Sequence, residues 1–174
     1  MKLIDKPCNM CYNDFNLINI VREHIMANGN LTPEETIKVS RSSIKQLIKK
    51  YNASNGLDKT TLQLIIEQLA KTPLFFAVQK GTADKKADEM SFLTLATGGQ
   101  VFIPIFTGED ELGKLADNAD IVVLYPQDYF DMLVSGNRHA VINPFSSYFL
   151  LWPELVRDHL IPFVQEKDGV IQQI

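Results

Sequence analysis

The sequence predicts an α/β protein with a mixed β-sheet packed against helices and preceded by a helical N-terminal segment. Three observations lead to this prediction. Helical patterns with recognisable capping residues occupy the first seventy positions. Short apolar runs separated by turn residues follow from position 74, and one of them contains Pro104. Beyond that proline, apolar runs alternate with helical patterns as far as about residue 160, which is typical of α/β proteins.

Composition and charge restrict the class of protein. The 174 residues are enough for one good core, and 45% hydrophobic with 22% charged residues is ordinary for a globular domain. No apolar run approaches the roughly 18 residues of a membrane span, and the N-terminal apolar run is too short for a secretory signal. We therefore expect a cytoplasmic protein with no membrane contact. Residues 71–174 hold eight basic and fourteen acidic side chains, which argues against nucleic-acid binding there.

Three helices are expected before the sheet. The first covers 15–26 and is capped by Asn13 or Asp14. The second begins at a capping box made by Thr32 and Glu35, with proline at its first position, and Asp58 caps the third. Their apolar stripes are formed by Ile37, Ile44, Leu47, Ile48 and Tyr51 in the second helix and Leu62, Ile65, Ile66 and Leu69 in the third.

The strands at 74–78, 91–96 and 100–106 should form an antiparallel meander. Gly98 and Gly99 are suited to the tight turn of a hairpin between the last two, because such turns need positive φ angles. The polar segment 79–90 should be a solvated excursion. Pro104 cannot donate a ladder hydrogen bond, so we expect it at a sheet edge or a bulge.

The remaining elements follow a strand–helix–strand–helix–strand order. Thr107 should cap a helix with Leu112 and Leu115 inward, followed by a strand at 121–124. A helix should run from Pro126 to Gly136, then a strand over 139–142, which favours right-handed crossovers and parallel neighbours. Pro153 should open a last helix ending near residue 159, and 161–174 would add a strand or a tail.

The block 61–160 resembles the N-terminal domain of the SseB family, the bacterial "enhanced serine sensitivity" proteins. The resemblance lies in the helix-to-strand segment 69–78, in Pro104 to Thr107 followed by acidic residues, and in Val141-Ile142-Asn143-Pro144 followed by serines. It implies an α/β domain with no established catalytic set, so no catalytic residue is transferred. The expected organisation is a helical segment over 1–60 and an SseB-like α/β domain over 61–174.

Cys8 and Cys11 have the spacing of a redox or metal-binding pair. No strand precedes them, as a thioredoxin-like site requires, and the chain has no second cysteine pair for zinc. His24 alone is a poor third ligand. An alternative hypothesis, a small thiol-dependent enzyme or metal-binding protein, rests on these two residues. The simpler interpretation is that they are two unpaired, partly buried thiols.

Other candidate groups have simpler structural interpretations. His24, His139 and His159 share no metal-ligand spacing, although His139 could carry a proton in a pocket, and Ser146 and Ser147 lack a nucleophile elbow. A basic ridge of Lys38, Arg41, Lys45 and Lys49 supports a third hypothesis, nucleic-acid binding, but no aromatic residue interleaves it. An acidic tract lacks the order of a calcium loop; it contains Glu109, Asp110, Glu111, Asp117, Asp120, Asp128 and Asp131.

The sequence favours a non-enzymatic interaction or regulatory module with a protein partner and no cofactor; it predicts no oligomeric state. The predicted surface lies where strands leave the sheet at their carboxyl ends, at Phe106, Thr107, Gly108, Asn143 and Pro144. Backbone N–H groups at a helix start there could receive a carboxylate or phosphate. The cluster from Phe145 to Trp152 is interpreted as core, or as a partner-binding patch if part of it is exposed.

Overall fold

The computed structural model describes residues 32–162. The first predicted helix, Cys8, Cys11, His24 and the tail after residue 162 lie outside the described residues. The chain divides within its first described helix into two units, Met1–Val39 and Ser40–Ile174. In chain order the helices and strands are α2 (Pro33–Ala53), α3 (Lys59–Leu69), β1 (Leu74–Val78), β2 (Leu95–Thr97), β3 (Gln100–Phe106), β4 (Asp120–Leu124), α4 (Pro126–Ser135), β5 (His139–Ile142), β6 (Phe149–Leu151) and α5 (Pro153–Leu155).

The predicted starts of the second and third helices are confirmed by their hydrogen bonds. At the start of α2 the backbone N–H of Thr32 donates to Oε2 of Glu35 at 2.9 Å, and the N–H of Glu35 donates back to Oγ1 of Thr32 at 3.3 Å. At α3 the carboxylate of Asp58 accepts from the N–H of Thr61 at 3.0 Å and from its hydroxyl at 2.6 Å. Both caps satisfy N–H groups that a helix leaves without an internal partner.

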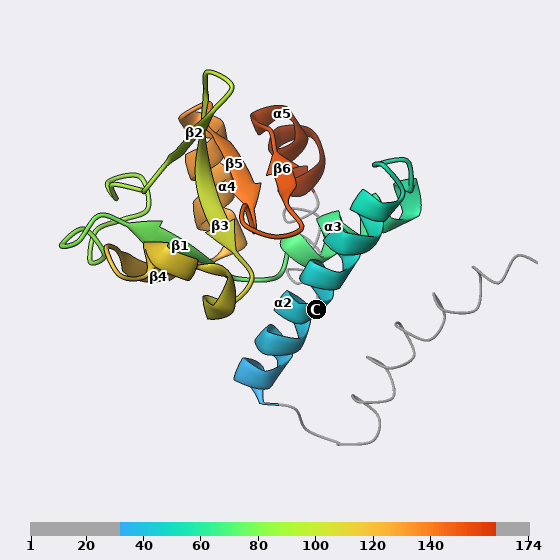
Figure 1. Cartoon of the computed structure of the whole chain (residues 1–174), viewed down its shortest axis with the longest axis horizontal. Helices are drawn as coiled ribbons and strands as arrows, with labels where there is room; N and C mark the ends of the chain where they lie inside the picture. The colour runs from blue at the N-terminus through green and yellow to red at the C-terminus, as the bar shows by residue number, and fades with distance from the viewer. Residues whose placement is uncertain (1–31, 163–174) are drawn as a thin grey trace, which may run out of the picture. The chain divides into compact units, whose positions relative to one another are not determined.

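The sheet is mixed, as predicted, with the order β4-β1-β3-β5-β6 and β2 paired to β3 (Figure 1). Among the strands that the structure describes, only β3 and β5 pair in parallel. The predicted antiparallel meander is confirmed in part, because Val78 of β1 forms an antiparallel bridge to Phe92 and β2 pairs with the beginning of β3. It does not include the direct pairing of β1 with the end of β3, Phe75 with Phe106. The predicted parallel neighbours are wrong for β4, which lies antiparallel beside β1. Local patterns define strands but contain no information about these long-range partners.

Pro104 lies inside the sheet, which corrects its predicted edge position. The carbonyl of Ile105 faces β5, where it accepts from the N–H of Asn143 at 2.8 Å. Successive residues of a strand direct their backbone groups to opposite sides, so the nitrogen of Pro104 faces β1 and β2. It falls between Phe102, the last residue of β3 paired with β2, and Ile105, where pairing with β1 begins. Pro104, which has no N–H to donate, therefore lies where the neighbour of β3 changes from β2 to β1.

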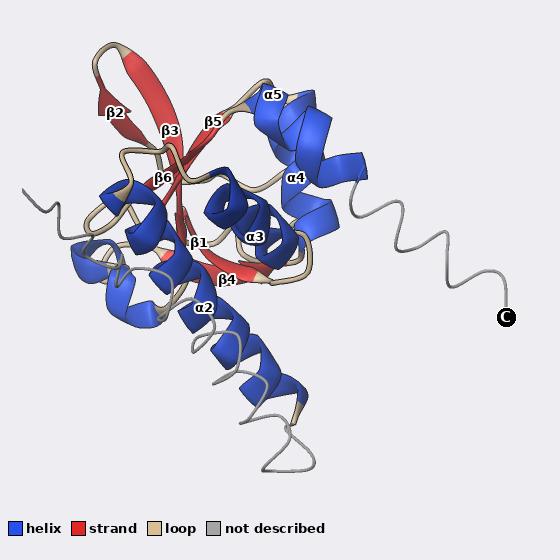
Figure 2. Ribbon diagram, turned by 90° about the vertical axis from the view of Figure 1, so that its right-hand side faces the viewer, coloured by secondary structure: helices blue, strands red, loops and turns tan. Residues whose placement is uncertain are grey.

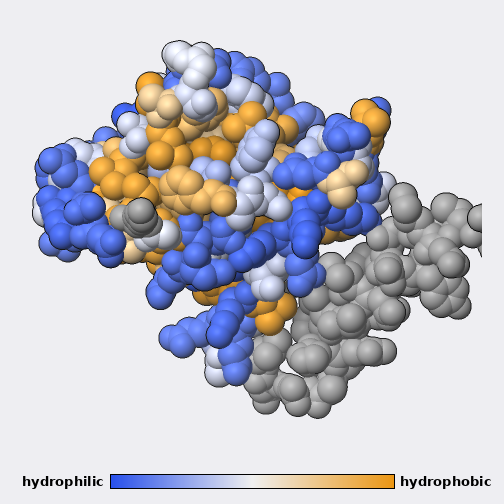
Figure 3. All heavy atoms as spheres, in the orientation of Figure 1, coloured by the Kyte–Doolittle hydropathy of each residue, from blue (hydrophilic) through white to orange (hydrophobic). Residues whose placement is uncertain are grey.

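The helices cover one face of the sheet. Figure 2 shows α3, α4 and α5 together on that face, and side chains from residues 44–69 pack there with alternate residues of β1, β3, β5 and β6 in the main core. A smaller cluster around Ala77, Phe106, Leu112 and Ala119 lies on the other face. Figure 3 shows that the face turned to the viewer carries a hydrophobic area over the middle of the sheet.

Two predicted helices differ from expectation, the first in length and the second in helix type. After Thr107 the chain forms only two 3₁₀ turns, Glu109–Glu111 and Gly113–Leu115. Gly113, the first residue of the second turn, has a φ of +54°, which an α-helix cannot accommodate. At the other end, α5 continues from Val156 to Leu160 as a π-helix. Among the described residues, no helix combines the length and hydropathy needed to cross a membrane.

Candidate functional site

The carboxyl ends of the parallel strands β3 and β5 are joined by Thr107 and Asn143. Thr107 donates its backbone N–H to Oδ1 of Asn143 at 3.0 Å, and Nδ2 of Asn143 donates to the Thr107 hydroxyl at 2.8 Å. Both residues are buried, Asn143 completely. Two residues that follow different strands thus satisfy each other's polar groups where water is excluded.

Asn143 also sets the direction of the loop that follows β5. Its φ of +48° is a left-handed conformation that asparagine tolerates better than most residues. Its carbonyl accepts from the N–H of Ser146 at 3.1 Å, which closes a turn directly after the strand. The segment 143–148, which we call the anchored loop, therefore leaves the sheet from a fixed starting point.

A second link holds the middle of the anchored loop. The hydroxyl of Ser146 donates to Oε2 of Glu111 at 2.7 Å, and the ammonium of Lys45 forms an ion pair with the same carboxylate. Lys45 also reaches Oδ2 of Asp110 at 2.9 Å. The hydrogen bond to Glu111, followed by that to Asp110, raises the pKa of Lys45. The hydrogen bond from Lys45 lowers the pKa of Asp110. The connection therefore joins α2, the first 3₁₀ turn and the loop.

A third link lies at the end of the loop. The side-chain amide of Asn52, near the end of α2, donates to the backbone carbonyl of Tyr148 at 2.9 Å. The anchored loop is therefore hydrogen-bonded at its first, fourth and last residues. Its conformation is determined by side chains from three separate parts of the second unit, which restricts its freedom before any partner arrives.

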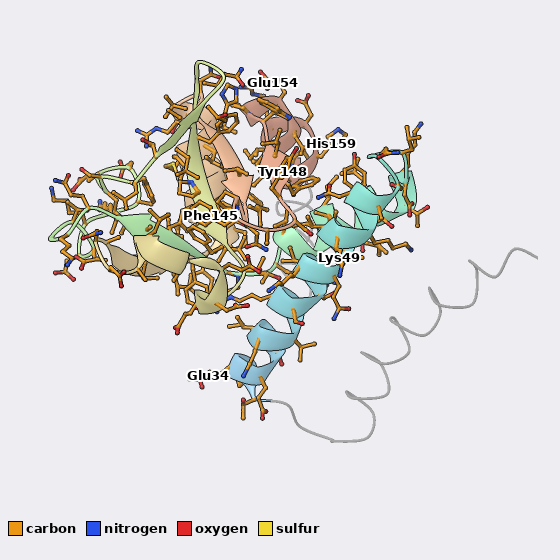
Figure 4. The ribbon with its side chains drawn as sticks, viewed as in Figure 1. Glu34, Lys49, Phe145, Tyr148, Glu154 and His159 are labelled. Carbon is orange, nitrogen blue, oxygen red and sulfur yellow. The ribbon has the colours of Figure 1, made fainter. Side chains whose placement is uncertain are left out.

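Two aromatic side chains on this loop are more than half exposed. Phe145 is 57% exposed and Tyr148 is 54% exposed. The ring of Phe145 stacks on that of buried Phe106 with centroids 6.2 Å apart. Figure 4 shows both exposed rings on the loop, with Glu154 and His159 on the helical segment that follows β6. Large exposed aromatic groups held in one conformation are the usual anchors of protein interfaces.

The five predicted surface residues come together, but they differ in exposure. Phe106, Thr107 and Asn143 are buried, whereas Gly108 and Pro144 are half-buried. The helix expected to begin at Thr107 is replaced by a short 3₁₀ turn, and the N–H of Thr107 is bonded to Asn143, so the expected anion site loses its structural basis. The buried residues therefore position the loop, and contact with a partner by the surface as a whole stays a prediction.

The other sequence candidates that lie within residues 32–162 are not brought together. His139 is at the opposite end of β5 from Asn143 and packs against the rings of Phe102 and Trp152, with centroids 5.9 and 5.0 Å away. His159 is exposed on the π-helix. Ser146 binds a carboxylate, and Ser147 is half-buried. Within residues 32–162, no group of three or more His, Cys, Asp or Glu side chains is arranged to hold a metal ion.

Two of the four residues of the basic ridge on α2, Arg41 and Lys45, make contacts within the chain. Arg41 donates to the carbonyl of Pro73 at 2.8 Å, and its guanidinium lies 3.9 Å from the centre of the Phe75 ring. Lys45 pairs with the acidic 3₁₀ turn. Phosphate binding by either residue would require breaking these contacts. This arrangement does not favour the nucleic-acid hypothesis, and it gives two members of the predicted ridge a structural role.

Sequence reasoning missed the contacts that fix the loop. Lys45 meets Asp110 and Glu111 across more than sixty residues of sequence, and Asn52 meets Tyr148 across 96. No local pattern predicts such pairs. Strand β6 was also missed, because its three residues form part of a continuous aromatic and aliphatic run. From sequence alone that run is interpreted first as core, and an exposed patch containing Phe145 and Tyr148 is only its second interpretation.

Comparison with protein-family models identifies the family of this chain. A family model described as the SseB protein N-terminal domain matches residues 47–158. The chain belongs to the SseB family. The match begins within α2, so the last third of that helix, from residue 47, is part of the SseB domain, and the match ends in the helical segment after β6. Comparisons with curated proteins and with solved structures gave no match. The predicted boundary between residues 60 and 61 stays a prediction.

Proposed function

We propose that this SseB-family chain is a non-enzymatic protein-interaction module whose contact surface is centred on the anchored loop. The observation that carries the proposal is the exposure of Phe145 and Tyr148 on a loop that is hydrogen-bonded at three points. The partner is a protein that covers these rings with apolar side chains. A bacterial and cytoplasmic setting is part of the proposal.

The energetic reasoning favours a binding surface. An interface must offset the entropy lost when flexible groups become ordered, and this cost is small for a loop that is already ordered. An aromatic side chain has only two rotatable bonds but buries a large area, so each ring contributes strongly for little lost freedom. Phe145 is further restricted by its stacking on Phe106.

The polar groups beneath the loop support the same conclusion. The amide of Asn143 is bonded to Thr107, and the carboxylate of Glu111 is bonded to Ser146 and Lys45. Groups that satisfy one another in this way hold a surface in shape. A catalytic acid or base would instead need a proton-transfer route to a bound substrate.

Affinity capture tests the proposal. The tagged full chain and its Phe145→Ser variant are used to capture proteins from the cytoplasm of the source organism, with quantitative mass spectrometry. We expect at least one protein to be captured by the natural chain and captured much less by the variant. Loss of one central aromatic anchor commonly costs about 2 kcal/mol or more of binding free energy.

Leu57→Ser is the matched control, because Leu57 is 79% exposed and lies outside the anchored loop. It should leave the captured set unchanged. Turnover of a defined metabolite by the purified chain, or a captured set that is identical for the natural chain and Phe145→Ser, would contradict the proposal. Circular dichroism of both variants confirms that folding is retained.

A further inference from the structure

A groove lies beside β6, on the side away from β5. It has a volume of about 310 Å³ and is lined mainly by apolar and aromatic groups, among them Tyr51, Leu62, Tyr148, Leu150, Trp152 and Leu155. A second hollow of about 320 Å³ shares Trp152 and Leu155 with it and is lined also by Glu154, Asp158 and His159. The two hollows adjoin, so one surface combines an apolar part with an acidic part.

The backbone of Leu150 is directed into this region. Because the N–H of Asn143 donates to Ile105, the backbone groups of Asn143 face β3 and those of the preceding residue, Ile142, face β6. Phe149, the partner of Ile142, therefore faces β5, and the next residue, Leu150, faces away from it. Within the described part of the chain, the N–H and C=O of Leu150 thus lie on the free edge of the sheet.

The groups on either side of Leu150 along this edge are already used. The carbonyl of Tyr148 accepts from the amide of Asn52 at 2.9 Å, and the carbonyl of Trp152 accepts from the N–H of Val156 at 3.1 Å. The free edge is therefore short and bounded at both ends by helices. Natural sheets restrict exposed edges in this way, and a short edge beside an apolar groove is suited to adding one extended peptide segment.

The charge of the adjoining hollow restricts the occupant. Glu154 and Asp158 are both exposed and lie one helical turn apart. An extended segment directs alternate side chains to the same side, about 7 Å apart. An apolar side chain in the groove would therefore bring a neighbouring side chain on the same side toward the carboxylates, which a lysine or arginine complements.

We propose that the β6 edge binds an extended segment of a partner protein that pairs with the backbone of Leu150, inserts an apolar side chain beside Trp152, and directs a lysine or arginine to Glu154 and Asp158. This inference rests on the proposed function and names the chemistry of the partner. Binding at the β6 edge needs neither Phe145 nor its stacking on Phe106. The proposed function and this inference can therefore fail separately.

Selection from a displayed library of random dodecapeptides on the immobilised full chain tests the inference. We expect the selected peptides to share an apolar residue with a lysine or arginine nearby, and to slow hydrogen exchange of the Leu150 amide measured by NMR. The double substitution Glu154→Lys and Asp158→Lys should weaken these peptides about tenfold or more, because it replaces attraction by repulsion. Asp131→Lys, on the exposed side of α4, is the matched charge control and should have no effect.

Three results would overturn the inference. The first is a set of selected peptides that carry no basic residue or leave the Leu150 amide unprotected. The second is a Leu150 amide that is protected in the free protein and becomes exposed on dilution, which identifies a second copy of the chain as the occupant. Protection that is independent of concentration and lost on removal of residues 1–31 or 163–174 identifies the chain's own ends. Normal capture by Phe145→Ser would leave this inference intact while contradicting the proposed function.

Discussion

The side-chain amide of Asn143 and the hydroxyl of Thr107 form a buried pair that joins the carboxyl ends of the two parallel strands, with Nδ2 and Oγ1 2.8 Å apart. The pair is the point at which the anchored loop starts. It links the stability of the sheet centre to the position of Phe145, because the loop direction depends on the left-handed backbone of Asn143.

Replacing Asn143 by alanine should lower the free energy of unfolding by about 3 kcal/mol, because buried groups of Thr107 lose their partner and alanine is strained at positive φ. Asn143→Gly should lose about 1 kcal/mol less, since glycine removes the strain but not the lost hydrogen bonds. Urea unfolding measures both. Asn137, exposed and with a φ of +47°, supplies the control. Equal losses for the two Asn143 variants would show that strain plays no part, and Asn137→Gly should change stability by less than about 0.5 kcal/mol.

Removing the ammonium of Lys45 should destabilise the chain although this side chain is 44% exposed. Its partner Glu111 is buried, and the loss leaves that carboxylate with Ser146 alone. We expect Lys45→Ala to cost about 1–2 kcal/mol, a value reduced by solvent screening of the exposed lysine. Lys49→Ala, one turn along the same helix, should change stability by less than about 0.5 kcal/mol. In a double-mutant cycle with Glu111→Gln, additive losses would mean that the two side chains do not interact.

The hydroxyl of Tyr129 is fully buried and donates to the carbonyl of Leu69 at 3.2 Å. Burial raises the pKa of Tyr129 far above its ordinary value of 10.0. Tyr129→Phe should cost about 1 kcal/mol near neutral pH, the usual contribution of one hydrogen bond. The stability from the un-ionised phenol is present below pH 10.0 and is lost as the pH rises above it, so the difference between the two proteins should narrow in alkali. Tyr125→Phe, at an exposed ring, is the control. Ionisation of Tyr129 in the folded protein near pH 10, seen by ultraviolet titration, would be inconsistent with its burial.

The contribution of Asp58 to stability should depend on pH. The hydrogen bond from the Thr61 hydroxyl, followed by that from the Thr61 N–H, lowers the pKa of Asp58 below its ordinary value of 3.8. Stability from a carboxylate of lowered pKa is present above the ordinary value and is lost as the pH falls through the lower, folded value. Asp58→Ala should therefore be less stable than the natural protein at neutral pH, with a gap that narrows below pH 3.8. Unfolding by urea across this range measures the gap, and a constant gap would show that Asp58 has no role as a charged cap. Asp58→Asn keeps an acceptor at the cap and should lose less at neutral pH.

The sequence predicts elements best where the deciding residues are close together. The capping box at Thr32 and the cap at Asp58 depend on residues three positions apart, and both are confirmed. The hairpin turn at Gly98 and Gly99 is also confirmed, with φ angles of +57° and +77°. Strand β5 has the predicted bounds, because its apolar run is short and clearly delimited.

Prediction fails where a distant partner decides. The acidic residues after Thr107 resemble the first turn of a helix, but Gly113 and the bonds of Glu111 to Lys45 and Ser146 hold this segment as short 3₁₀ turns. The position of β1 between β3 and β4 depends on pairing across the whole sheet. The residues predicted for the candidate surface lie together at the ends of β3 and β5, and their binding role stays a prediction. The exposure of the neighbouring rings of Phe145 and Tyr148 depends on side-chain directions that sequence spacing does not determine.

The single parallel pairing of β3 with β5 has a consequence during synthesis on the ribosome. By the time residue 124 has emerged, β3 can already pair with β1 and β2 on one side, but its other side waits for residues 139–142. Until then an apolar strand in the middle of the future sheet presents unsatisfied backbone groups to the surrounding solution. A nascent chain arrested or cleaved before Asn143 is therefore the form of this protein most exposed to aggregation, and the form that a chaperone would recognise first.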